Sequence, residues 1–177
     1  SALNDYANNV EINKFGGRFK YSKLNTLIDR VDNGITSNIT KVIVRRDLKA
    51  LLNQFAQYEL CYGNRFYINP AGYNIKSTGF TINGFSQIAY ITDVPNKTIS
   101  GALDGSLKGT LSVITKNNQG QQVVLIKDAG IVDYKKGEVI LNTINITSTV
   151  SENNIIEIQA FPESNDVVGL KDLYLSF

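Results

Sequence analysis

The stretch FKYSKLNTLIDRVDNGITSNITKVIVRR, from residue 19 to residue 46, carries a helix signal that is followed by a strand signal. Over residues 22–33 the apolar side chains recur at spacings of three and four, which predicts a helix with one apolar stripe. The members of this stripe are Tyr21, Leu24, Leu27, Ile28 and Val31. Because Leu27 and Ile28 stand in its middle, we expect both side chains to be buried.

The ends of this helix and the strand behind it also have signals. Ser22 is a candidate N-cap, since its hydroxyl can accept a hydrogen bond from an unpaired first-turn N–H. Asn33-Gly34 is a candidate stop, because glycine adopts the left-handed conformation without a Cβ penalty. Alternation over 38–47, with Val42 and Val44 on one face, predicts a strand that returns alongside the helix. We interpret the whole stretch as a docking platform, since it holds no catalytic pattern.

Composition excludes several classes of partner. The chain has 177 residues, 42% of them apolar, which fits one domain or two small ones. Its 18 basic and 16 acidic residues nearly cancel, so the chain lacks the strong positive field that nucleic acid or an anionic membrane selects. No apolar run approaches the roughly 20 residues of a membrane-spanning helix. We expect neither nucleic acid nor a membrane as partner.

The residues that usually carry catalysis are sparse. The sequence has no histidine, the side chain that most often serves as general base or metal ligand. Cys61 is the single cysteine, so no internal disulfide is expected, and its place in a predicted strand favours a buried, inert thiol. The glycine-rich run 101–110 fails the spacing of a phosphate-binding loop. We expect no enzyme, no metal and no cofactor.

One pair of carboxylates in the predicted helix has two interpretations, a catalytic pair or part of a solvated surface. A glycosidase that uses two carboxylates is the enzyme hypothesis that we carry. Asp29 and Asp32 share a side of the predicted helix and could form a carboxylate pair. Lys23 and Arg30 lie close by, however, which favours a solvated ion-pair face. Enzymatic activity is therefore the weakest of the hypotheses that we carry.

The remainder of the chain is dominated by strand signals. Asn83-Gly84, between two alternating runs, predicts a tight hairpin. We predict a fold that is α+β and mainly β, in which an N-terminal helix and antiparallel strands are followed by a β-meander. Residues 1–95 would form a helix-plus-sheet part and residues 96–177 a β-rich part, or both would form one domain. The predicted strands after the first cover 55–62, 65–68, 80–82, 87–92, 110–116, 121–127, 130–134, 138–146, 155–161 and 173–177.

Aromatic side chains suggest an interface as the functional alternative to a core. Tyrosine and phenylalanine gather at 55–66 and 80–90, where the ordinary interpretation is a core for short strands. Exposed tyrosine and arginine are also what protein interfaces select. Tyr62, Arg65 and Phe66, which flank a predicted turn at Gly63, are our candidates for such an interface.

The end of the sequence supplies a second candidate interface. The chain starts with Ser-Ala, contains no methionine and ends within an alternating run, so we interpret it as a fragment of a longer protein. Leu173, Leu175 and Phe177 share one side of a predicted edge strand that carries no charge. Because uncharged edges pair readily with other chains, we expect a homodimer that buries about 1,200–2,000 Å² or more.

Several of these runs together resemble a known family. The runs are FKYSKL at 19–24, ID at 28–29, ITSNIT at 35–40, RR at 45–46, GNRF at 63–66 and GIVDYKKGEVI at 130–140. They resemble the T-even type of baseplate wedge protein from contractile-tailed phages, within the baseplate J-like group. The resemblance covers most of the chain, and its runs are structural signatures without catalytic residues.

The resemblance implies a structural protein of the virion. Such a subunit would be assembled in the host cytoplasm and located in the tail baseplate. It would associate with itself and with other wedge subunits in an inner ring that joins the wedges around the hub and rearranges on tail contraction. The alternative, from the residues alone, is a carbohydrate-binding or adhesin-like β module with exposed aromatic side chains.

Overall fold

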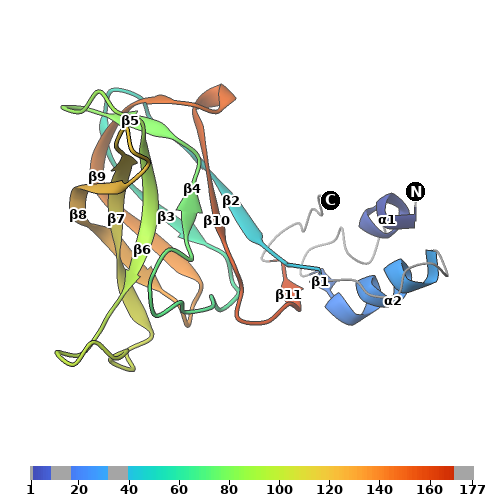
Figure 1. Ribbon diagram of the computed structural model, residues 1–177. Coiled ribbons are helices and arrows are strands. Elements are labelled where there is room, and N and C mark those ends of the chain that lie inside the picture. Colours follow the sequence, from blue (N-terminus) through green and yellow to red (C-terminus); the bar gives the residue numbers. More distant parts are fainter. Residues whose placement is uncertain (1, 9–16, 32–39, 170–177) are drawn as a thin grey trace.

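The computed structural model describes residues 2–8, 17–31 and 40–169 (Figure 1). The fold is mainly β with a small helical part at the N-terminus, as predicted. The proposed helix stop at Asn33-Gly34 and the proposed terminal strand 173–177 lie outside the described residues. The elements are α1 Ala2–Ala7, β1 Arg18–Phe19, α2 Tyr21–Val31, β2 Val44–Lys49, β3 Phe55–Cys61, β4 Lys76–Ser77, β5 Phe80–Ile82, β6 Ala89–Pro95, β7 Lys108–Lys116, β8 Gln122–Asp133, β9 Glu138–Thr149, the 3-10 turn η1 Glu152–Asn154, β10 Ile155–Ala160 and β11 Val167–Val168.

Nine strands form one antiparallel sheet, which we call the β body. Its order is β2-β10-β4-β6-β5-β9-β8-β7, and β3 pairs with the other edge of β9. The pairings β6–β7, β7–β8, β8–β9, β9–β5 and β5–β6 close a circuit of strands. The structure does not confirm the expected β-meander, in which each strand would pair with the next along the chain. Instead, β9 and β10 pair with strands from the first half of the chain. The ladder between β6, which ends at Pro95, and β7, which begins at Lys108, also joins the two predicted parts, 1–95 and 96–177, in one sheet.

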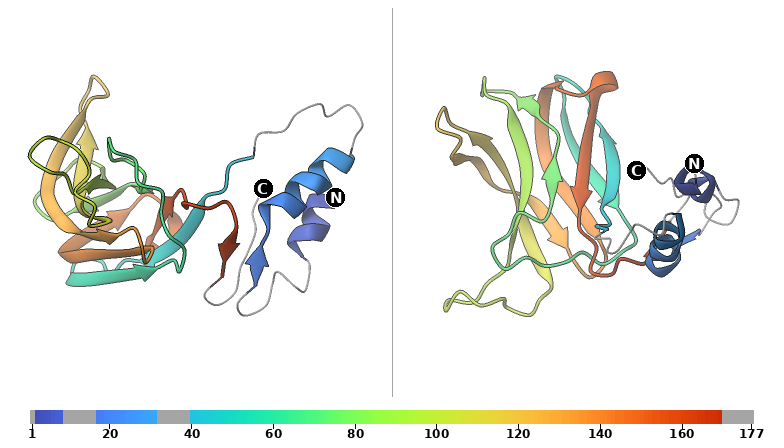
Figure 2. Two further views of the ribbon diagram at one scale, coloured as in Figure 1. Left: turned by 90° about the horizontal axis from the view of Figure 1, so that it is seen from below. Right: turned by 45° about the vertical axis from the view of Figure 1, so that its right-hand side comes forward.

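The strand after α2 lies further along the chain than we predicted. It covers Val44–Lys49 rather than 38–47, and it runs into the β body instead of returning beside the helix (Figures 1 and 2). Its inward residues follow the predicted phase, with Val44 half-buried and Leu48 buried. Leu48 faces Ile156 of β10, so burial in the main core sets the position of this strand.

Local turn chemistry explains two connections and fails at a third. Asn117–Gly120 and Lys135–Gly137 join antiparallel neighbours, as predicted. At the predicted tight hairpin, Gly84 does adopt a positive φ of 88°. The hairpin prediction is nevertheless wrong in its pairing, because β5 meets β6 only at Phe80 and Ala89 and otherwise pairs with β9.

The predicted strands 121–127 and 130–134 form the single strand β8. Asp128 interrupts it with a positive φ of 57°, and the ladder with β7 shifts register nearby. Beyond this irregularity, only the second part of β8, from Gly130 to Asp133, pairs with β9. The first part therefore diverges from β9 and stays in the sheet through β7 alone.

The core of the β body is built from inward-facing side chains on most of its strands. Aliphatic residues dominate, and burial at this scale supplies most of the stability of a domain. The largest fully buried side chains are Tyr134, Phe66, Phe80, Ile75, Ile91, Leu111, Leu141, Ile146, Ile156, Ile158, Val113 and Val132.

A buried carboxylate lies within this core. Asp93 on β6 is fully buried, and its Oδ1 accepts a hydrogen bond of 2.7 Å from the backbone N–H of Ile75. Its Oδ2 accepts a second bond of 2.7 Å from the hydroxyl of Tyr134, beyond the end of β8. Desolvation by burial raises the pKa of Asp93, although these hydrogen bonds act in the opposite direction. The carboxylate thus links three segments of the chain at a cost in desolvation.

We predict that replacing Asp93 by asparagine removes one source of pH dependence in stability. Because the pKa of Asp93 is higher in the folded state than its ordinary 3.8, its stabilising contribution is complete below that value and is lost as pH rises. The free energy of unfolding of the native chain, minus that of Asp93→Asn, should therefore fall from acidic to neutral pH. Urea unfolding of both chains across this range measures the difference. A difference that stays constant with pH contradicts the prediction.

Candidate assembly interface

Two helices and a short ladder form an appendage beside the β body. It comprises α1, α2 and the two-stranded sheet of β1 and β11, and it stands apart from the larger sheet (Figures 1 and 2). Two segments connect the appendage to the body, one from residue 40 to β2 and the other from β10 to β11. No helix within the described ranges is long and apolar enough to cross a membrane.

The two-stranded sheet joins segments that are far apart in the sequence. Arg18 pairs with Val168 and Phe19 pairs with Val167. The N–H of Gly169 also donates to the carbonyl of Gly17, at 2.9 Å. The chain that leaves β10 therefore forms part of the appendage and supports α2 directly.

The first turn of α2 is capped by this returning segment. Oδ1 of Asp166 accepts a hydrogen bond of 2.8 Å from the backbone N–H of Tyr21. Ser22, our candidate N-cap, instead lies inside the helix, where its carbonyl accepts a bond from the Thr26 hydroxyl. The N-cap prediction is wrong because the capping carboxylate comes from a residue 145 positions away. A negative charge at a helix N-terminus also interacts favourably with the helix dipole.

A small apolar cluster holds the helices to this ladder. Leu24 is buried, 2% exposed, and packs with Phe19 and Val167. Ile28 is half-buried against the cluster, whereas Leu27 is half-buried but does not contribute to it. Our expectation that Leu27 and Ile28 are buried is therefore wrong. The helix turns its Leu24 side toward β1 and β11, which supply the buried side chains of Phe19 and Val167.

Asn64 fixes the returning segment to the β body. Its Nδ2 donates to the carbonyl of Val168 at 2.8 Å, and its Oδ1 accepts from the N–H of the same residue at 2.8 Å. The side-chain amide thus satisfies both backbone groups of Val168, as a neighbouring strand would. We call this pair of bonds the Asn64 clamp. Its position is set by Gly137, where a Cβ would collide with the backbone of Asn64.

Two further polar contacts hold the same segment. Arg65 forms an ion pair of 2.9 Å with Glu163, both of them about half exposed. Asn74 is buried, and its Nδ2 donates to the carbonyls of Tyr67 and Phe161. Since exposed ion pairs contribute little, the buried amide of Asn74 contributes more to this attachment than the Arg65–Glu163 pair does.

The predicted interface residues are separated by the structure. Tyr62 and Phe66 are buried, 3% and 2% exposed, and their rings pack edge to face with centroids 4.9 Å apart. They cannot form an exposed face, which corrects that part of our interface prediction in favour of the core interpretation. Arg65 is exposed but is paired with Glu163. Leu173, Leu175 and Phe177 lie outside the described residues.

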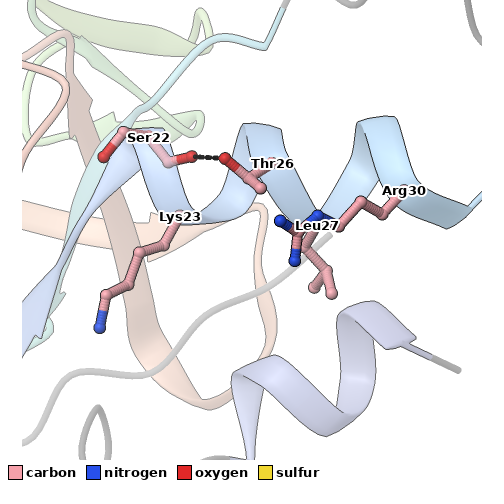
Figure 3. Close-up of a pocket in the computed structure, with 5 residues that line it drawn as sticks. All are labelled: Ser22, Lys23, Thr26, Leu27 and Arg30. Atoms are coloured by element: carbon pink, nitrogen blue, oxygen red, sulfur yellow. Dashed lines mark hydrogen bonds between the residues drawn. The ribbon is translucent and has the colours of Figure 1, made fainter.

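The outward side of α2 carries a surface that sequence reasoning treated only as a solvated face. Ser22, Lys23, Thr26, Leu27 and Arg30 line an open depression of about 340 Å³ (Figure 3). We call this surface the α2 outer face. It places one aliphatic side chain between two cations. Asp32, proposed to pair with these cations, lies outside the described residues, and Asp29 does not line the depression.

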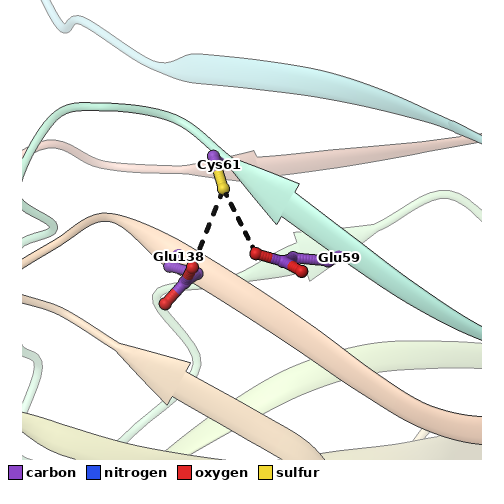
Figure 4. Close-up of side chains that lie close together, drawn as sticks. All are labelled: Glu59, Cys61 and Glu138. Atoms are coloured by element: carbon purple, nitrogen blue, oxygen red, sulfur yellow. Dashed lines mark hydrogen bonds between the residues drawn. The ribbon is translucent and has the colours of Figure 1, made fainter.

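A second cluster surrounds the single cysteine. Cys61 is exposed, which corrects the expectation of a buried thiol, because it occupies an outward position of β3. Its Sγ lies 3.7 Å from a carboxylate oxygen of Glu59 and of Glu138 (Figure 4). Partial desolvation and these two carboxylates raise the pKa of the thiol, which lowers its reactivity. Glu138 also pairs with Lys136 at 3.8 Å. Three ligand atoms with a neutral thiol do not match a structural zinc site, so we assign no metal here.

The N-terminal part of the chain matches a known protein family. Residues 1–47 match the family model described as "Baseplate structural protein gp6, C-terminal domain III". This range includes α1, β1, α2 and the start of β2, and therefore the α2 outer face. No curated protein matches the chain. The match supports a phage baseplate protein with a structural role.

We predict that the Asp166 cap stabilises α2. Asp166→Ala removes the acceptor for the Tyr21 N–H and should lower the stability of the helix by about 0.5–2 kcal/mol. Asp166→Asn is the matched control, because its amide oxygen can still accept that bond. Urea unfolding followed by the helical circular-dichroism signal provides the measurement. Equal midpoints for the alanine and asparagine variants would show that the contact does not cap the helix.

Proposed function

We propose that this chain is a structural subunit of a phage tail baseplate wedge. In this proposal it resides in the virion tail, is assembled in the host cytoplasm and joins copies of itself and other wedge subunits in the inner ring around the hub. The ring rearranges on tail contraction. The observation that carries the proposal is the match of residues 1–47 to a baseplate domain, on a segment that folds as an appendage with an outward helix face.

A non-catalytic role agrees with the chemistry of the described residues. The chain has no histidine, and its one cysteine has a raised pKa. Asp93 is fully buried, and its carboxylate accepts hydrogen bonds from the N–H of Ile75 and the hydroxyl of Tyr134. These contacts favour a structural role for this side chain. These features favour assembly over catalysis as the function.

The first part of β8 is the surface that we propose for self-association. Residues 122–127 pair with β7 on one edge only, and their other edge has no ladder partner within the described part of the chain. Val123 and Val124 are 42% and 56% exposed. Residues 122–126 carry no charge and no proline, the features with which proteins usually protect an edge.

This edge is compatible with its own copy. In a two-fold antiparallel pairing centred between Val124 and Leu125, Gln122 would face Lys127 of the second copy, and no like charges would meet. Pairing of one patch with itself closes a dimer. We therefore propose a homodimer with an extended sheet, which leaves α2 available for a different partner.

Sedimentation of the full chain tests this proposal. We expect a dimer at micromolar concentration, and we expect Val124→Lys to weaken it by roughly tenfold or more, because two lysines would meet near the symmetry axis. Val150→Lys is the matched control, since Val150 is 66% exposed and lies outside β8. Its dimerisation should remain that of the native chain.

Two results would count against the proposal. A native chain that sediments as a 19.6 kDa monomer at every concentration contradicts self-association. A dimer that is insensitive to Val124→Lys contradicts the assignment of its contact to β8.

A further inference from the structure

We infer that the α2 outer face binds an acidic, amphipathic helix of a different baseplate subunit. This inference rests on the proposed function and names the chemistry of one partner. Three observations carry it: the geometry of the face, the absence of a carboxylate near its two cations among the described residues, and the arrangement of these cations relative to a second copy of the chain.

The geometry suits a helical ligand. Lys23 and Arg30 are seven residues apart, so they lie two turns apart, about 10 Å along the helix axis. Leu27 lies between them and is only half-buried, which leaves part of its apolar surface exposed in the depression (Figure 3). The hydroxyl of Thr26 donates to the carbonyl of Ser22 at 2.9 Å, so it does not compete for the ligand.

Some basic residues of the β body are held in ion pairs. Arg45, Arg65 and Lys136 each have a carboxylate within 4.0 Å. Lys23 and Arg30 have none among residues 2–8, 17–31 and 40–169. We take these two charges as the contacts for an anionic group on another chain, since no described carboxylate neutralises them.

A second copy of α2 does not fit this face. In an antiparallel pairing centred between Thr26 and Leu27, Lys23 would face Arg30 of the other copy. In a parallel pairing each cation would face its own equivalent. Both arrangements place like charges together, which is destabilising across a helix interface. The face thus favours a partner of opposite charge, whereas the β8 edge favours a copy of itself.

The charge pattern of the partner follows from that of the face. An acidic residue at one position of a helix and a second one seven residues later would reach Lys23 and Arg30 together. Apolar residues three and four positions after the first would lie on the same side, against Leu27. Because the contacts are mostly surface ion pairs, binding should weaken as salt is raised.

A designed peptide provides the probe for the experiment. It is a helical peptide of about 16 residues with two glutamates seven apart, two leucines between them on the same side and alanine elsewhere. A second peptide carries glutamine in place of both glutamates, and a third carries lysine. Binding of each labelled peptide to the full chain is measured by fluorescence anisotropy at low and high salt.

Charge reversal on the protein makes the result specific. We expect the glutamate peptide to bind the native chain at least roughly tenfold more tightly than the glutamine peptide. Lys23→Glu with Arg30→Glu should reverse the preference, so that the lysine peptide binds better. Lys97→Glu with Lys135→Glu, two exposed positions on the β body, is the matched control and should leave binding of the glutamate peptide unchanged.

The inference is overturned if the glutamate peptide does not bind, or if it binds the charge-reversed chain as well as the native one. Its failure can be distinguished from failure of the proposed function by sedimentation of the same proteins. A charge-reversed chain that still dimerises, with no peptide bound by the native chain, removes only this inference. A monomeric native chain that binds the glutamate peptide removes only the proposed self-association.

Discussion

The appendage depends on the Asn64 clamp, through which one side-chain amide satisfies both backbone groups of Val168. That contact positions β11, and β11 in turn carries the ladder to β1 and the Asp166 cap on α2. The buried members of the apolar cluster on the described residues are Phe19, Leu24 and Val167, so these polar contacts add to a small core beneath two short helices. The position of the α2 outer face is consequently set by residues of the β body.

The molecule separates its two proposed contacts physically. The β8 edge is uncharged and belongs to the body, whereas the α2 outer face is cationic and belongs to the appendage. In the proposal, the uncharged edge pairs with its own copy, whereas the cationic face disfavours its own copy because like charges would meet. A subunit with both features can add to a symmetric assembly and also take up a different neighbour, as the proposed ring requires.

Sequence reasoning succeeded where short-range chemistry sets the structure. The alternation of β3 and the turns at 117–120 and 135–137 follow from residue type and spacing alone. It failed where the partner is distant: Asp166 caps a helix 145 residues away, and Asn64 binds a strand 104 residues away. Exposed tyrosine and buried tyrosine share one sequence signal, so Tyr62 was assigned to an interface when it belongs to the core. The sequence shows the two cations, Lys23 and Arg30. It does not show that neither forms an ion pair with another described residue.

Native-state hydrogen exchange on the full chain, comparing the native protein with Asn64→Ala, tests most directly whether the β body holds the appendage. The backbone amides of α2 should lose protection in the variant, because β11 and the Asp166 cap would be released together. The amides of β9, which are bonded within the sheet, should keep theirs. Unchanged protection in α2 would contradict the account, since the helix would then be held without the clamp.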